Sequence, residues 1–215
     1  MSNPHPSDLR DLLALHLADG LGPARIAALL EHFGSANRVL RASPGELMQV
    51  SGIGSQLSAT LASSLRSVDP DTEIARATAA GVHLLALGQA GFPAYLAAIP
   101  AAPRVVYVKG NILQTDERAV ALVGTRHPTA YGRKIAKALG EGLARAGVTV
   151  VSGLARGIDG ISHRGALDGG GRTLAVLAGG LSRIYPPEHR GLADEVVAKG
   201  ALVTESAPCR ASGAS

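Results

Sequence analysis

The feature that most constrains the fold is a repeated unit of strand, glycine-containing turn and helix between residues 119 and 166. An apolar run over residues 119–123 stops at Gly124, and apolar residues then recur at helical spacing. A second apolar run, residues 148–151, is followed by another glycine-punctuated turn and another helical pattern. Two successive units of this kind predict a parallel α/β sheet with right-handed connections.

Glycines and polar residues follow both predicted strands. In an open α/β sheet, ligands collect at the carboxyl ends of the strands, where helix N-termini direct free N–H groups toward them. Glycine lets a phosphate approach the backbone closely, and arginine can hold a phosphate with two hydrogen bonds. The sequence therefore predicts a phosphate-bearing ligand held by residues of the two turns: Gly124, Thr125, Arg126, Ser152, Gly153, Arg156, Gly157 and Asp159.

Composition limits the class of protein. A chain of 215 residues with 46% hydrophobic residues has room for one α/β domain and one small accessory domain. It contains no apolar stretch of transmembrane length and no signal-peptide pattern, so we expect a soluble cytoplasmic protein. The single cysteine, Cys209, excludes an intramolecular disulfide and is expected to have no special role. Neither a metal nor a nucleotide cofactor is expected.

The net charge of +4 arises entirely within residues 116–215. This half is therefore the better candidate for a surface that binds a polyanion. Arg133, Lys134 and Lys137 fall in one predicted helix. They either guide nucleic acid or form an ordinary solvated face.

The N-terminal part contains an internal repeat. Residues 20–22 (Gly-Leu-Gly) and 52–54 (Gly-Ile-Gly) each precede a helical pattern. The repeat resembles a tandem helix-hairpin-helix, or SAM-like, domain, and that resemblance implies backbone contacts to DNA phosphates. Ordinary helical hairpins are the alternative, because the tips lack clustered Lys and Arg. We expect three regions: a helical domain (1–66), a linker (67–74) and an extended Rossmann-like domain (75–215) with extra strands before its core.

Five segments spread over residues 91–205 carry a more specific signal: GFPAYLAAIPAAPRVVYVKGN, VALVGTRHPTAYG, VVSGLARGIDGISHRGAL, GGRTLAVLAGGLSRIYPPEHRGL and ALVTE. In this order and spacing they resemble the DNA-processing protein A family (DprA, also called Smf). Its members bind single-stranded DNA and help to load RecA during natural transformation. The resemblance implies a non-catalytic protein that protects incoming DNA, with RecA as a partner and a homodimer in the full-length family.

The resemblance also extends the candidate site. Arg126 falls on the arginine of the family's GxR turn, and residues 152–159 fall on its SGxAxGID turn. His163 lies one helical turn further on, and Arg190 follows the Tyr185-Pro186 loop. The resemblance implies backbone and arginine contacts to one DNA strand, with bases held at a pocket.

The chain stops where the second half of the family's Rossmann domain is expected, so we expect the domain to be incomplete at its C-terminus. The family's dimer contacts and RecA-binding surface are expected in that second half. Dimerisation and RecA loading by this chain are therefore left open.

Two interpretations of site residues, and the function itself, have alternatives. Asp159 and His163 are either a general acid–base pair or structural residues, with Asp159 capping a helix and His163 packed against the strand-end turn. Tyr185 either stacks on a base or packs against the two following prolines. No nucleophile accompanies these residues, so we do not expect an enzyme. The alternative function is a nucleotide-processing enzyme of the lysine-decarboxylase-like phosphoribohydrolase type, although its PGGxGT turn is absent.

Overall fold

The computed structural model describes residues 6–207, so Cys209 lies outside the described residues. These residues form two compact units. One unit contains the chain up to Thr78 together with Leu84–Val105, and the other contains Ala79–His83 and the chain from Val106 onward. Each unit is described separately below.

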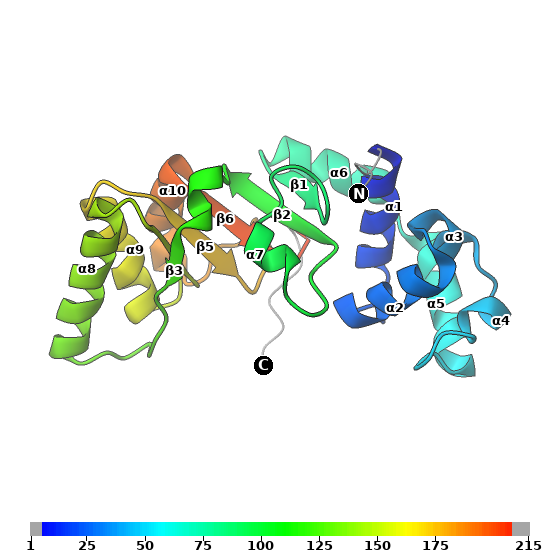
Figure 1. The fold of residues 1–215 in the computed structure, drawn as a ribbon. Helices are drawn as coiled ribbons and strands as arrows, with labels where there is room; N and C mark the ends of the chain where they lie inside the picture. Colours follow the sequence, from blue (N-terminus) through cyan, green and yellow to red (C-terminus); the bar gives the residue numbers. More distant parts are fainter. Residues whose placement is uncertain (1–5, 208–215) are drawn as a thin grey trace. The chain divides into compact units, whose positions relative to one another are not determined.

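The first unit begins with six helices, drawn in blue to cyan-green in Figure 1. They are α1 (Pro6–Leu17), α2 (Pro23–Phe33), α3 (Ala36–Arg41), α4 (Pro44–Leu47), α5 (Ser55–Ser67) and α6 (Pro70–Ala79). Their apolar stripes bury one shared core, whose larger members include Leu15, Ile26, Leu29, Val39, Leu47 and Leu61. Burial of these side chains, rather than intrinsic helix propensity, is what stabilises such short helices.

The predicted glycine repeat has the same geometry in both copies. Gly20 and Gly52 have φ values of 83° and 82°, in the left-handed region that favours glycine. Gly22 and Gly54 then adopt extended backbone conformations as the N-caps of α2 and α5. The repeat therefore builds two equivalent turns, each opening a helix.

The predicted linker, residues 67–74, contains the last residue of α5 and the first half of α6. The Asp69 side chain accepts hydrogen bonds from the backbone and hydroxyl of Thr72, and Pro70 occupies the first helical position. An Asp cap followed by Pro is a strong helix start. The structure thus divides the chain differently from the predicted boundaries, and it groups the irregular segment around α7 (Ala94–Ala97) with the helical unit.

The sheet has six strands in the order β1-β2-β6-β5-β4-β3. They are β1 (His83–Ala86), β2 (Val105–Gly110), β3 (Ala119–Ala121), β4 (Thr149–Ser152), β5 (Thr173–Leu177) and β6 (Ala201–Thr204). Strands β3, β4, β5 and β6 pair in parallel with one another, whereas β2 pairs antiparallel with the other edge of β6. The Rossmann-like parallel core is confirmed, with the earlier strands added beyond β6, so the complete sheet is mixed.

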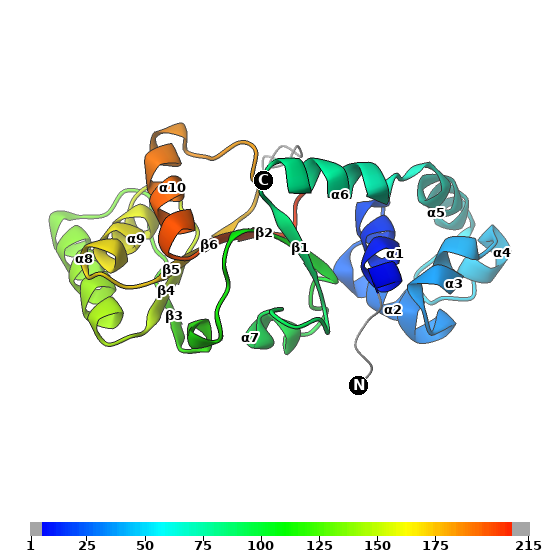
Figure 2. The same cartoon turned by 90° about the horizontal axis from the view of Figure 1, so that it is seen from above.

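Three helices connect the parallel strands: α8 (Ala130–Arg145), α9 (Ile158–Asp168) and α10 (Arg190–Lys199). Each strand lies beside the previous one, so right-handed crossovers place all three helices on one face of the sheet. Figure 2 shows this helical layer beside β3 to β6, with α9 packed between α8 and α10. Two short 3-10 helices, Gln114–Glu117 and Pro187–His189, complete the described elements of this region.

Candidate nucleic-acid interface

Three connections meet at the carboxyl edge of the parallel strands. Residue Ala121 of β3 pairs with Val151 of β4, and Ser152 pairs with Ala175 of β5, so the strands end side by side. We call the segment 122–129 the first turn, 153–157 the second turn and 178–189 the third loop. Together they form what we call the strand-end site, and all of it belongs to the sheet unit.

Close backbone packing joins the first two turns. Gly157 has φ 80°, and a Cβ there would overlap the carbonyl oxygen of Thr125 and lie 2.8 Å from the Cα atom of Arg126. The Ile158 N–H donates to the same Thr125 oxygen at 3.2 Å. A Cβ on Gly124 would lie 2.8 Å from Cγ1 of Ile158. Glycine at 124 and 157 is therefore required for these two turns to touch.

Arg126 is the exposed cation of the first turn. Its side chain forms no hydrogen bond or ion pair within residues 6–207. Its backbone is fixed by Gly157 on one side, and His127 donates its N–H to the Thr125 hydroxyl at 3.1 Å on the other. A rigid backbone carrying an uncommitted guanidinium is suited to hold a phosphate.

Arg156, in the second turn, already has partners in the third loop. Its Nε donates to Glu188 Oε1 at 2.6 Å and its Nη2 donates to Oε2 at 3.1 Å. Its Nη1 donates to the Tyr185 hydroxyl at 3.1 Å, and the guanidinium lies 5.4 Å from the centre of that ring. These hydrogen bonds hold the pKa of Glu188 below its ordinary value. Tyr185 thus contacts an arginine, a contact that neither predicted alternative included.

Ser152 and Asp159, both predicted as ligand contacts, are buried in the structure. The Ser152 hydroxyl donates to the carbonyl of Leu122 at 2.6 Å. One oxygen of Asp159 accepts the N–H groups of Gly153, at 3.2 Å, and Ala155, at 3.4 Å. The side chains of Ser152 and Asp159 thus hold the backbone of the two turns in place through hydrogen bonds. The N-cap of α9 is Gly157 and not Asp159.

His163, also predicted as a ligand contact, is fully buried and lies against the start of β5 rather than the strand-end turn. Its Nδ1 lies 2.6 Å from the hydroxyl oxygen of Thr173, which donates its own proton to the carbonyl of Val150 at 2.8 Å. His163 Nδ1 is therefore the donor, and Nε2 has no hydrogen-bond partner. Burial first, and the nearby His189 second, lower the pKa of His163 to about 4. His163 is therefore paired with Thr173, whereas Asp159 is paired with the backbone of the second turn, so the two side chains have separate partners.

Arg190 begins α10 and is exposed. Arg133 and Lys134 on α8 are exposed as well, and no ion pair or hydrogen bond of these three side chains occurs in the described part of the chain. Lys137 differs, because it pairs with Asp168 at 2.9 Å and with Glu141 at 3.8 Å. Of the three cations predicted on this helix, Arg133 and Lys134 therefore have no ion-pair partner among the described residues, whereas the charge of Lys137 is balanced by carboxylates.

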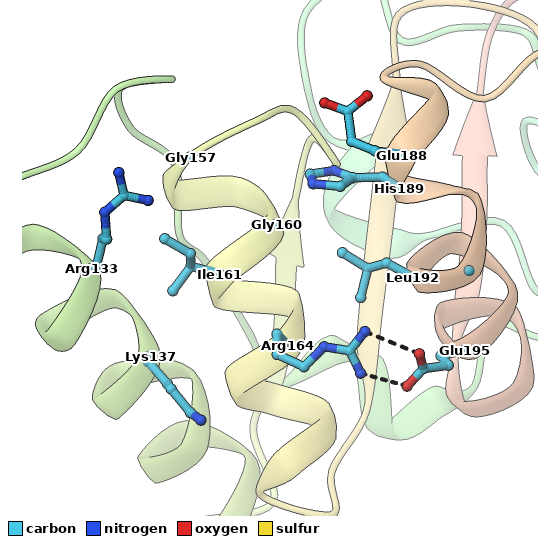
Figure 3. A pocket seen from close by; sticks show the side chains of 11 residues that line it. Arg133, Lys137, Gly157, Gly160, Ile161, Arg164, Glu188, His189, Leu192 and Glu195 are labelled. Atoms are coloured by element: carbon cyan, nitrogen blue, oxygen red, sulfur yellow. Dashed lines mark hydrogen bonds and ion pairs between the residues drawn. The ribbon is translucent and has the colours of Figure 1, made fainter.

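A groove of about 570 Å³ crosses the outer side of the helical layer (Figure 3). Its floor is α9, and its walls come from α8 and from the segment around the start of α10. Gly157 and Glu188 lie at one end, and an ion pair between Arg164 and Glu195 lies further along it. The second turn therefore borders both the strand-end site and this groove.

The described residues contain neither a metal-binding cluster nor a membrane-spanning helix. No group of three or more His, Cys, Asp and Glu side chains between residues 6 and 207 is arranged to hold a metal ion. Within the same residues, no helix combines the length and the apolarity needed to span a bilayer.

Glu188, the partner of Arg156, was not predicted from the sequence. The two residues are 32 positions apart, so no local spacing connects them. The available signal was topological: one follows β4 and the other follows β5, and adjacent parallel strands end at the same edge.

Comparisons with known proteins agree with this architecture. Residues 83–213 match the family described as DNA recombination-mediator protein A, and residues 9–79 match the SAM-like helix-hairpin-helix tandem. The chain is 32% identical to a protein Smf of Synechocystis sp. over 197 residues, covering 90% of this chain and 50% of that protein. It is 39% identical to the DNA processing protein DprA of Bacillus subtilis over 129 residues, covering 60% and 43%. The chain thus spans half or less of the length of these two relatives.

Solved structures give the same result. DNA processing protein A from Streptococcus pneumoniae superposes with a TM-score of 0.76 at 26% identity, over 98% of this chain and 70% of that one. DNA processing protein A from Helicobacter pylori, described for its single-stranded DNA binding mode, gives a TM-score of 0.53 at 26% identity, over 60% and 58%. With the family match covering more than half of its residues, this chain belongs to the DNA recombination-mediator protein A (DprA/Smf) family and carries an N-terminal SAM-like helix-hairpin-helix tandem.

Proposed function

We propose that this chain binds single-stranded DNA at the strand-end site, with Arg126 as its central phosphate contact. The protein would act without catalysis, covering incoming DNA during natural transformation. Family membership supports this function, and a Helicobacter pylori relative is described as binding single-stranded DNA. The observation that carries the proposal is the uncommitted guanidinium of Arg126 on a backbone fixed by Gly157.

The distribution of cations favours a polymer over a mononucleotide. Besides Arg126, the exposed cations whose side chains have no partner among the described residues include Arg133, Lys134 and Arg190, which come from other segments of the sheet unit. A single strand offers a row of phosphates to such a spread of charge, whereas a mononucleotide offers only one phosphate group. Catalysis is disfavoured because Asp159 and His163, the one acid–base pair considered from the sequence, are buried and engaged with separate partners.

Salt dependence provides the test. If these four cations each contact one phosphate, log K should fall with log salt with a slope of about −3, since each contact to a single strand contributes about −0.7. Affinity for a fluorescent thirty-nucleotide oligo-dT should then fall about fiftyfold between 50 and 200 mM salt. Excess thymidine monophosphate should not displace the oligonucleotide. A shallow slope, or displacement by the mononucleotide, would favour the nucleotide-processing alternative.

The partners form a second part of the proposal. We propose that the bound strand passes to a RecA recombinase in the cytoplasm, and that association of two copies supports this transfer. The support is family membership, while the chain spans only half of the length of its Synechocystis relative. Sedimentation of this chain, and RecA filament growth on DNA coated with it, are the relevant measurements. Filament growth no faster than on bare DNA would contradict RecA loading by this chain.

A further inference from the structure

The ion pair between Arg156 and Glu188 occupies the donors that a phosphate would use. Two N–H groups of the guanidinium point to the two oxygens of one carboxylate, at 2.6 and 3.1 Å. Arginine binds phosphate through the same pair of parallel hydrogen bonds. The Glu188 carboxylate thus mimics a phosphate ligand of Arg156.

Glu188 lies beside the proposed path of the DNA strand. Arg156 directly precedes Gly157, whose backbone touches Thr125 and Arg126 in the first turn. Figure 3 shows Glu188 at the same end of the groove as Gly157. A strand whose phosphate contacts Arg126 would therefore approach Arg156 and meet a negative carboxylate there.

The pair can be exchanged for a phosphate. The two side chains are 43% and 51% exposed, and exposed ion pairs contribute little net stability because water solvates both charges. A phosphate that replaces Glu188 would restore both hydrogen bonds of Arg156, while the freed carboxylate would become hydrated. The structure is therefore compatible with two states of Arg156, one paired with Glu188 and one paired with DNA.

We propose that Glu188 is a built-in competitor of the DNA phosphate for Arg156, which lowers the affinity of the strand-end site for single-stranded DNA. The inference rests on the proposed function and adds a residue that regulates the same site. In this arrangement, Arg126 supplies the permanent contact and Arg156 supplies a contact that forms only when Glu188 is displaced.

The chain contains a matched control. Arg164 and Glu195 form a second two-bonded pair at 2.6 and 3.0 Å, with the same exposures of 43% and 51%. This pair joins α9 to α10, away from the glycine turns (Figure 3). Glu188→Gln and Glu195→Gln therefore remove the same charge from the same kind of ion pair, and only the first is predicted to free a DNA contact.

The experiment measures oligo-dT affinity by fluorescence anisotropy at several salt concentrations, with circular dichroism confirming that each variant is folded. Glu188→Gln should bind about fivefold more tightly than wild type at 50 mM salt, with a salt slope steeper by about 0.7. Glu195→Gln should change the affinity less than twofold. When Arg156→Gln is already present, adding Glu188→Gln should give no more than the small change seen with Glu195→Gln.

The outcomes separate this inference from the proposed function. If wild-type binding depends on Arg126 but Glu188→Gln binds no more tightly than Glu195→Gln, the competitor role is wrong and the DNA site stands. If no folded variant binds oligo-dT at 50 mM salt, both proposals are wrong. Tighter binding by Glu188→Gln that persists in full without Arg156 would also overturn the competitor role, because the gain would then be a general charge effect.

Discussion

Gly157→Ala is predicted to destabilise the sheet unit and to disturb the strand-end site at the same time. The backbone at this position has φ 80° and ψ −127°, a sparsely populated conformation that costs a residue with a side chain about 1–3 kcal/mol. The added methyl group would also overlap the Thr125 carbonyl and lie 2.8 Å from the Cα of Arg126. Because these neighbours are backbone atoms, they cannot rotate away, and the two turns must separate.

Gly170→Ala is the matched control variant for this prediction. Gly170 has φ 78°, and a Cβ there would have no neighbour within 4 Å. Gly170→Ala therefore shares the positive φ and lacks the overlap. We expect Gly157→Ala to lose about 3 kcal/mol or more of folding stability, which is about 2 kcal/mol more than Gly170→Ala loses.

Thermal denaturation followed by circular dichroism tests the difference. For a chain of this size, 1 kcal/mol shifts the melting temperature by about 2–4 °C, so Gly157→Ala should melt roughly 4–8 °C below Gly170→Ala. Its affinity for oligo-dT should also fall, since the backbone that carries Arg126 is displaced. Equal melting temperatures for the two variants would refute the close contact between the first and second turns.

Two further predictions concern the helical layer. Gly140→Ala should destabilise the protein by about 1–3 kcal/mol in urea denaturation, because its Cβ would lie 2.6 Å from the Ser162 carbonyl, whereas Gly142→Ala, with open space around it, should stabilise α8 by about 0.5–1 kcal/mol. Effects of the same sign would contradict the tight packing of α8 on α9. His163 has its pKa lowered to about 4 by burial, so the unfolded state binds the proton first as the pH falls. Its contribution to stability should be intact above about pH 6.5 and decrease by up to about 3 kcal/mol toward pH 4. His163→Asn, which keeps an N–H for Thr173, should flatten this part of the pH–stability curve, and an unchanged curve would show that His163 is not the buried neutral group described here.

The strands of the parallel core could be predicted because the sequence marks both of their ends. Continuous apolar runs that end at glycines are typical of strands in a parallel sheet, and the predicted run over residues 148–151 overlaps β4. The glycine repeat was equally informative, since only glycine adopts the positive φ of Gly20 and Gly52 without strain. The apolar runs and the glycine repeat are patterns of residues close together in the sequence, and they were sufficient to predict the fold class.

The side-chain partners at the site could not be predicted in the same way. Ser152 and His163 are polar, but their partners lie in other segments of the chain: the carbonyl of Leu122 in the first turn and the hydroxyl of Thr173 in β5. Arg156, predicted to contact a ligand, binds Glu188 of the third loop in the structure, and residue spacing did not indicate this partner. Such pairings depend on the order of strands in the sheet and on side-chain direction, and neither is encoded in residue spacing.

The affinity of oligo-dT for Arg126→Ala and Arg118→Ala tests the central claim most directly. Arg118 precedes β3 and Arg126 follows it, so the two exposed arginines lie toward opposite ends of one strand and carry the same charge. Neither side chain has a hydrogen bond or ion pair within the described residues. If DNA occupies the strand-end site, Arg126→Ala should weaken binding about tenfold or more at 50 mM salt and Arg118→Ala less than about twofold, since a charge-assisted contact contributes about 1.5–3 kcal/mol. Equal losses for the two variants, or no loss for Arg126→Ala, would contradict a DNA site at the carboxyl ends of these strands.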